Sequence, residues 1–156
     1  MTFAARPYHL SDAGARLIGQ FEGYRANAYR DVGNIWTIGY GSTHVNGVPV
    51  KEGDTIDVPR ALKALQEEAQ MDATFLESAI VNPLTQNQVD ALISLCYNIG
   101  VGAFSGSTLR RTINARQPVT EKMFTDWNKV RVNGVLTPSN GITRRRAAEY
   151  ALFMTA

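Results

Sequence analysis

The sequence has 156 residues, of which 44% are apolar and 19% charged, so it can bury the core of a domain and is unlike an intrinsically disordered chain. A formal net charge of +2 argues against a nucleic-acid-binding protein. A single cysteine, Cys96, excludes an intrachain disulfide.

The first predicted helix covers residues 12–23, because Ser11 is a suitable N-cap and apolar residues then recur at helical spacing. Over residues 29–50 the pattern changes, and glycines separate short β-prone pieces. Asn46-Gly47 within this stretch is a strong tight-turn signal. The pieces predict a small antiparallel sheet of two or three short strands, which must pack against a helix to be stable.

Helical patterns return after the sheet. A long amphipathic helix is predicted over 58–80, with Asp57 as its cap. Thr85–Gln88 has the pattern of a capping box, and the helix over 86–98 that it opens is apolar nearly all round, which is typical of a buried central helix. A loop is expected at Asn133-Gly134. Further helices are predicted over 107–115, 118–129 and 142–153.

These elements predict a mainly helical α+β fold. We expect residues 1–156 to form one domain, because no linker separates two independent parts. Its small lobe would cover about 24–57, and a connecting helix about 58–80 would join it to a larger helical lobe. That lobe would combine residues of about 11–23 and 81–156.

Glu22, Asp31 and Thr37 are the candidate catalytic residues. Each has an ordinary explanation by itself: a solvated helix end, an Asx turn and a good strand former. Together they suit glycosidic-bond cleavage, in which one carboxylic acid protonates the leaving oxygen. The second carboxylate is a nucleophile or activates a water molecule. A helix end that faces a hairpin would put these groups on opposite walls of a cleft.

The stretch Phe21–Asp31, followed by Trp36–Gly41, resembles the signature of the phage-type lysozymes, the endolysin family of muramidases. The shared pattern is E-G-x-R-x-x-A-Y-x-D, a short gap and W-T-I-G-Y-G, which is specific because many residues match at fixed spacing. Weaker family marks follow at Tyr97–Leu109 and Gly141–Glu149. The resemblance therefore extends over 11–153 and implies a lysozyme-like fold.

The resemblance also implies an activity: hydrolysis of the β-1,4 bond between N-acetylmuramic acid and N-acetylglucosamine in peptidoglycan, with no cofactor and no metal. Glu22 would be the general acid, and Asp31 and Thr37 would position or activate the water. Asp31 could instead stabilise the oxocarbenium-like centre. The family's inverting outcome predicts carboxyl groups roughly 6.5–9.5 Å apart. Glycines of the motif would let the backbone approach a sugar closely. The implied substrate-binding residues are Gly41, Thr43, Tyr97, Asn98 and Ser107.

One position departs from the family pattern. Many members carry histidine directly after the W-T-I-G-Y-G segment, where this chain has Ser42, and the nearest histidine, His44, is expected on an exposed loop. Structural roles also stay open for part of the binding set. Tyr97 and Asn98 are equally suited to ending a buried helix, and Ser107 is suited to capping the next one.

Other conspicuous residues have structural explanations. Trp36 should pack between sheet and helix, since strand alternation points it away from the side of its neighbour in the motif. Cys96 should lie in the core. Arg144, Arg145 and Arg146 are expected on a solvated helix face with salt bridges, with attraction to an anionic wall as the alternative.

Two other classes of function stay open: a catalytically silent wall-binding module, and a related glycan-cleaving enzyme, either a lytic transglycosylase or a chitinase. We expect a monomer that acts on peptidoglycan glycan strands, with no nucleic-acid partner and no stable membrane insertion. Residues 1–10 lack the apolar core of a signal peptide. The expected location is therefore the host cytoplasm before lysis, and the periplasm and cell wall once the membrane is permeabilised.

Overall fold

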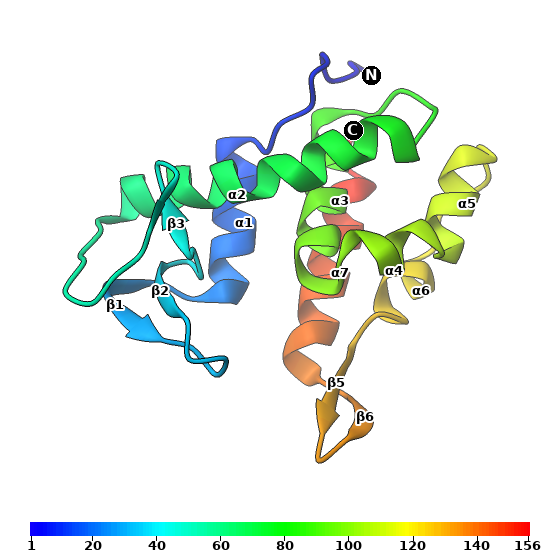
Figure 1. Ribbon diagram of the computed structural model, residues 1–156. Coiled ribbons are helices and arrows are strands. Elements are labelled where there is room, and N and C mark those ends of the chain that lie inside the picture. Colours follow the sequence, from blue (N-terminus) through cyan, green and yellow to red (C-terminus); the bar gives the residue numbers. More distant parts are fainter. The chain divides into compact units, whose positions relative to one another are not determined.

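The computed structural model describes residues 1–156 (Figure 1). The chain divides into two compact units. One unit is Leu10–Met71, and the other combines Met1–His9 with Asp72–Ala156. The fold is mainly helical with three antiparallel strand pairs, which confirms the predicted α+β class. In chain order the elements are α1 (Asp12–Glu22), β1 (Arg25–Arg30), β2 (Trp36–Gly39), β3 (His44–Val45), β4 (Val48–Pro49), α2 (Val58–Ala79), α3 (Gln86–Ile99), α4 (Val101–Ser105), α5 (Thr108–Asn114), α6 (Glu121–Thr125), β5 (Lys129–Val132), β6 (Val135–Pro138) and α7 (Asn140–Phe153).

Helix α1 belongs to the unit that contains the first four strands, whereas the sequence grouped it with the later helices. Packing explains this difference. A Cβ atom added at Gly19 would lie 2.9 Å from the Tyr40 ring, so α1 packs directly on that ring. Gln66 of α2 also donates hydrogen bonds to the Leu10 carbonyl (3.1 Å) and to Asp12 Oδ1 (2.9 Å). That residues 1–156 form one domain stays a prediction.

The predicted small sheet is two separate strand pairs, β1 with β2 and β3 with β4. The chain turns away from β2 at Gly39 and Gly41, whose φ angles are +65° and +95°, and this turn interrupts the sheet. Asn46-Gly47 joins β3 to β4 with φ angles of 52° and 76°, as its turn signal predicted. The half-buried Trp36 packs, as expected, against a small buried core made of Ile38, Val50, Ile56, Ala61 and Ala64.

In the other unit, α3 is the buried helix that the sequence predicted, and it lies beside α7 (Figure 1). Thr85 and Gln88 form the expected capping box. Cys96 is buried, and burial raises the pKa of its thiol, so this cysteine is a core residue. No helix of the structure combines the length and the apolar composition that a membrane crossing requires.

The helix predicted over 118–129 is wrong in extent, since only α6 is helical there. A hairpin, β5–β6, follows it and turns at Asn133-Gly134 with φ angles of 50° and 81°. The expected loop at this dipeptide is therefore a tight hairpin turn. The physical reason is that β-branched valines flank the Asn-Gly pair on both sides, which favours strands over a loop. The short helix α4 was also not predicted.

The solvated face expected for the arginines of α7 is wrong for two of them. Arg146 and Glu149 are 0% exposed, and Arg146 Nη2 lies 2.6 Å from Glu149 Oε1. Arg145 is also buried and donates a hydrogen bond to the Ser94 carbonyl of α3 (3.1 Å). Only Arg144 of the three is exposed. These charges belong to the α3–α7 interface, where each needs a partner in place of water.

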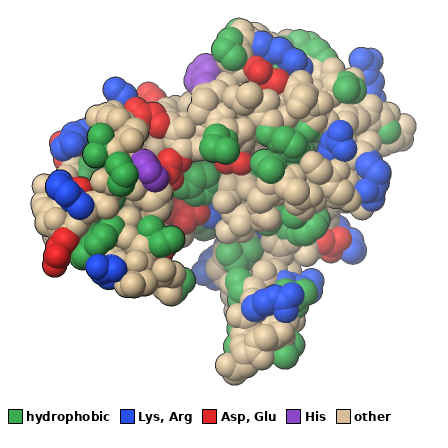
Figure 2. All heavy atoms as spheres, viewed as in Figure 1, with side chains coloured by type: hydrophobic (Ala, Val, Ile, Leu, Met, Phe, Trp, Pro, Cys, Tyr) green, Lys and Arg blue, Asp and Glu red, His purple; other side chains and the backbone are tan.

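Exposed charges of both signs are distributed over the surface. On the face drawn in Figure 2, Lys and Arg side chains are interspersed with Asp and Glu side chains, in keeping with the net charge of +2.

Candidate functional site

Glu22 is the last residue of α1 and its side chain is exposed. The helix ends there because Gly23 adopts a φ of 78°, while its N–H still bonds to the Gly19 carbonyl. Glycine tolerates this left-handed conformation without steric cost. The local sequence therefore places a carboxyl group at the surface, at the point where the chain leaves α1 for β1.

Asp31 lies in the turn between β1 and β2, and the backbone holds its carboxylate. Oδ1 accepts hydrogen bonds from the N–H groups of Gly33 (2.8 Å) and Ile35 (2.9 Å). The Asx-turn explanation is therefore correct, and it does not compete with a catalytic role. Two backbone bonds to one oxygen orient the carboxylate before any substrate binds, and Oδ2 lies outside this pair of bonds.

Thr37 lies in β2 opposite Tyr29 of β1, and only 3% of it is exposed. Its hydroxyl donates to the Ile35 carbonyl (2.9 Å), so the oxygen keeps its lone pairs as acceptors. The same carbonyl accepts the N–H of Asp31 (3.0 Å). The peptide groups of Ile35 therefore connect Asp31 and Thr37 directly, and this hairpin positions both side chains.

Two arginines are stacked on aromatic rings of this strand pair. The Arg25 guanidinium lies 4.2 Å from the centroid of the Tyr29 ring. Arg30, next to Asp31 in sequence, lies 4.6 Å from the Trp36 ring centroid and also donates to Asn34 Oδ1 (3.1 Å). Stacking of this kind holds a guanidinium in place while leaving part of it open to anions.

Two glycines of the motif have different surroundings. A Cβ atom at Gly39 would lie 3.0 Å from the Ala61 Cβ, so this glycine is required for the packing of α2. The structure thus gives Gly39 a packing role, and a close sugar approach at this glycine stays a prediction. A Cβ atom at Gly41 would meet nothing within 4 Å. The backbone at Gly41 is therefore accessible, and its sugar contact stays a prediction.

The loop after Gly41 is held by a residue that the sequence did not indicate. Glu68 Oε1 of α2 accepts hydrogen bonds from the N–H groups of Thr43 (2.9 Å) and His44 (3.3 Å). Thr43 Oγ1 lies 3.1 Å from Nδ1 of His44, which is exposed as expected. Ser42, in place of the family's histidine, is fully buried, and its hydroxyl has no hydrogen-bond partner. Glu68 is 25 residues from Thr43, so no local pattern could have found it.

The remaining predicted binding residues belong to the other unit. Ser107 is buried and caps α5: its Oγ accepts from Arg110 N–H (3.1 Å) and donates to the Phe104 carbonyl (2.7 Å). The capping explanation is thus correct, and a substrate contact of this hydroxyl stays a prediction. Tyr97 is half-buried, and Asn98 is exposed at the end of α3. Asn98 contributes to a cavity of about 420 Å³ that is also lined by Trp127, Lys129, Leu136 and Ile142.

One compact unit therefore contains five of the predicted site residues. Glu22 ends α1 and Thr37 lies in β2, whereas Asp31, Gly41 and Thr43 lie in the loops that follow β1 and β2. No group of three or more His, Cys, Asp or Glu side chains lies together so as to hold a metal ion. An exposed carboxyl, an oriented carboxylate and a hydroxyl acceptor can perform acid–base hydrolysis.

Comparison with known proteins identifies relatives over nearly the whole chain. The family model described as phage lysozyme matches residues 19–149. The endolysin of Acyrthosiphon pisum secondary endosymbiont phage 1 is 41% identical over 149 residues, covering 95% of this chain and 99% of that protein. The endolysin of Bacillus phage B103 is 36% identical over 94% of this chain, which spans 54% of that longer protein. A solved endolysin from Escherichia coli O157:H7 phage FAHEc1 has a TM-score of 0.85 at 36% identity, with 98% of this chain and 96% of that chain covered.

Proposed function

The chain belongs to the phage lysozyme family and is a peptidoglycan-degrading lysozyme, and from this premise we propose that it is an N-acetylmuramidase. It hydrolyses the β-1,4 bond between N-acetylmuramic acid and N-acetylglucosamine. The observation that carries this proposal is the shared anchoring of Asp31 and Thr37 on the peptide groups of Ile35. This hairpin follows directly on the helix that ends at Glu22.

Each of the three residues has one role in the proposed reaction. Glu22 gives its proton to the leaving glycosidic oxygen as the bond to the anomeric carbon breaks. Asp31 accepts a proton from the water that attacks this carbon from the opposite face. Thr37, whose own proton is engaged by Ile35, accepts a hydrogen bond from that water and orients it. One water is consumed, and the anomeric configuration is inverted.

The variant Glu22→Gln tests whether Glu22 is the general acid. Glu67→Gln, which replaces an exposed acid of α2, is the matched control. Clearing of chloroform-treated Gram-negative cells should fall about 10²–10⁴-fold for Glu22→Gln, because the leaving oxygen loses its proton donor. The melting temperature should stay equal or rise, and Glu67→Gln should clear cells normally. Activity within about tenfold of the unmodified protein would exclude Glu22 as the acid.

Product analysis separates the rival activities. Mass spectrometry of the released muropeptides should find reducing N-acetylmuramic ends, since water is the acceptor. Anhydromuramic ends would identify a lytic transglycosylase, and wall binding without clearing would identify a silent module.

The variant Thr37→Glu tests whether Thr37 places the water. If this variant clears cells as fast as the unmodified protein, Thr37 has no part in the mechanism.

The proposed setting is phage lysis. The endolysin reaches peptidoglycan from the host cytoplasm after the membrane is permeabilised, and it acts as a monomer without a cofactor. Gly41, Thr43, Tyr97, Asn98 and Ser107 are its proposed sugar contacts. The accessible backbone at Gly41 and the cavity beside Asn98 support this assignment most directly.

A further inference from the structure

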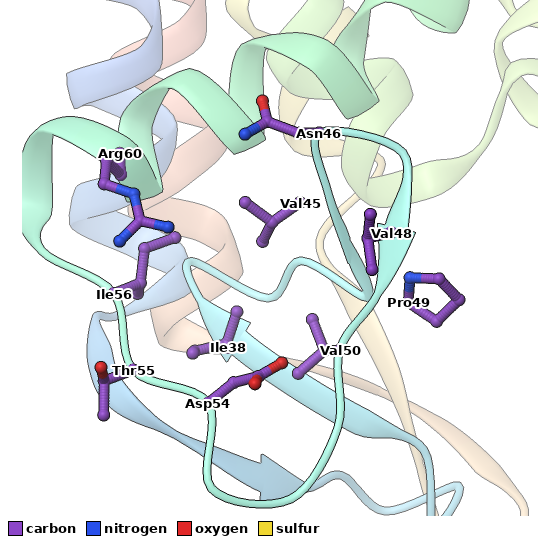
Figure 3. A pocket seen from close by; sticks show the side chains of 10 residues that line it. All are labelled: Ile38, Val45, Asn46, Val48, Pro49, Val50, Asp54, Thr55, Ile56 and Arg60. Carbon is purple, nitrogen blue, oxygen red and sulfur yellow. The ribbon is translucent and has the colours of Figure 1, made fainter.

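A cavity of about 240 Å³ lies within the unit Leu10–Met71, beside the strand pair β3–β4 (Figure 3). Aliphatic side chains form its interior. Three of them also belong to the small buried core of this unit, so the cavity opens from that core toward the surface. These interior residues are Ile38, Val45, Val50 and Ile56.

The cavity is separate from the candidate catalytic residues. Ile38 lines the cavity and Thr37 precedes it in β2, and successive side chains of a strand point to opposite faces. The cavity and the Thr37 hydroxyl therefore lie on opposite sides of β2. A ligand in the cavity would leave the Thr37 side of the strand uncovered.

Polar side chains at the rim of the cavity have no partner within the protein. Asn46, Thr55 and Arg60 line it and are exposed, and none of their side chains makes a hydrogen bond or an ion pair. The only carboxylate in the lining, Asp54, is already paired, with Oδ1 2.6 Å from Lys51 Nζ and Oδ2 accepting Lys51 N–H (3.0 Å). The unneutralised charge of the cavity is therefore the guanidinium of Arg60, which Figure 3 shows extending from α2 toward Ile56.

The size and lining of the cavity define its ligand. Its volume is below the roughly 300–1,000 Å³ typical of sites for drug-sized ligands, so it suits one or two small residues rather than a disaccharide. A guanidinium binds a carboxylate through two parallel hydrogen bonds. The amide of Asn46 and the hydroxyl of Thr55 can serve a peptide group, and the aliphatic interior suits methyl side chains.

We propose that this cavity binds the free carboxyl-terminal end of a peptide stem of the bacterial wall, with its small alanyl side chains. Charge complementarity supports this occupant, because the wall polymer is anionic and the cavity carries one unpaired cation. The choice of a wall peptide rests on the proposed function. Binding at this second site would hold the enzyme on uncleaved wall while the catalytic residues act on glycan.

The test is a titration of the full chain followed by amide chemical shifts, with the dipeptide D-alanyl-D-alanine as the probe. Shifts should concentrate at residues 45–60, with a dissociation constant on the order of 1–10 mM for so small a ligand. The C-terminal amide of the same dipeptide should bind at least about tenfold more weakly, because it lacks the carboxylate. Shifts elsewhere, or equal binding of the amide, would overturn the proposal. L-alanyl-L-alanine should bind more weakly, and equal binding would overturn the wall assignment.

Variants make the assignment specific to Arg60. Arg60→Gln should weaken binding of the dipeptide about fivefold or more. Lys63 is an exposed cation one turn later on α2, and Lys63→Gln should leave the affinity unchanged. Thr55→Glu places a negative charge at the rim and should also weaken binding without altering Arg60. Equal effects of the two cation variants would refute the site. Glu22→Gln should bind the dipeptide normally although it no longer clears cells. If the unmodified protein binds the dipeptide but clears no cells, the proposed function alone is refuted.

Discussion

Charged residues serve opposite purposes in the two units of this protein. In the unit Leu10–Met71, Glu22 is exposed and Asp31 is half-buried, with its carboxylate oriented by backbone N–H groups. In the other unit, Arg146 and Glu149 are fully buried and lie 2.6 Å apart. Burial alone raises the pKa of Glu149, and the two adjacent arginines oppose this effect.

Both groups of charges lie within the segment that the family model matches, residues 19–149. A position inside the matched segment therefore does not by itself distinguish a residue that takes part in the reaction from a residue of the core. Among the acidic residues exposure does tell them apart, because a carboxyl group that exchanges protons with substrate must be reached by it. Thr37, a hydroxyl that is 3% exposed, falls outside this criterion. Arg146 and Glu149 instead pair with each other within α7, and the neighbouring Arg145 bonds α7 to Ser94 of α3.

The variant with the largest expected effect is Arg146→Met, and Arg144→Met, at an exposed position, is its control. Loss of Arg146 leaves Glu149 buried without its main partner, so the free energy of unfolding should fall by about 3–5 kcal/mol at pH 8. Arg144→Met should change it by less than about 0.5 kcal/mol. Denaturant unfolding measures both variants, and similar values would remove the contrast between buried and exposed charge.

The same variant has a defined pH dependence. Without Arg146, burial keeps the pKa of Glu149 above its ordinary value of 4.5. A carboxyl group with a raised pKa stabilises the fold fully at low pH, and this contribution is lost as pH rises through the folded-state pKa. The loss of unfolding free energy in Arg146→Met should therefore be smaller at pH 5 than at pH 8.

Asp72 lies between the exposed and the fully buried acids. Burial raises its pKa from 3.8 to about 6, and it is only partly covered. Its contribution to stability is present below about pH 4 and is lost as pH rises through 6. Asp72→Asn should add about 1–2 kcal/mol to the free energy of unfolding at pH 7.5, after allowance for solvent screening, and nothing at pH 3.5. An equal gain at both pH values would contradict this account.

The smallest expected effects are those of two variants in the same unit, one at a capping residue and one at a proposed substrate contact. Ser107→Ala should lower the free energy of unfolding by about 1 kcal/mol, because α5 loses its cap. Asn98→Ala, at an exposed position, should leave stability within about 0.5 kcal/mol and raise KM on purified wall. If Asn98→Ala destabilises the fold and leaves KM unchanged, its predicted substrate contact is wrong.

Local patterns predicted the helices well wherever a cap and an apolar period agreed, as at Ser11 for α1 and Thr85 for α3. The hairpin β5–β6 turns at Asn133-Gly134 between valines, so it carries the same local turn signal as Asn46-Gly47, although a loop was expected there. The candidate catalytic residues came from the spacing of the motif. Chemistry by itself left Glu22 and Asp31 as two ordinary acids.

Local patterns in the amino-acid sequence were enough for the capped helices α1 and α3, the turn at Asn46-Gly47, the family and the three residues proposed for the reaction, because caps, periodicity and motif spacing are local properties of the chain. Only the tertiary structure decided which charges are buried, as at Arg145, Arg146 and Glu149. It also decided that Gly39 serves the packing of α2 and that Glu68 holds the loop at Thr43. These facts depend on contacts between residues far apart in the chain, which no local pattern records.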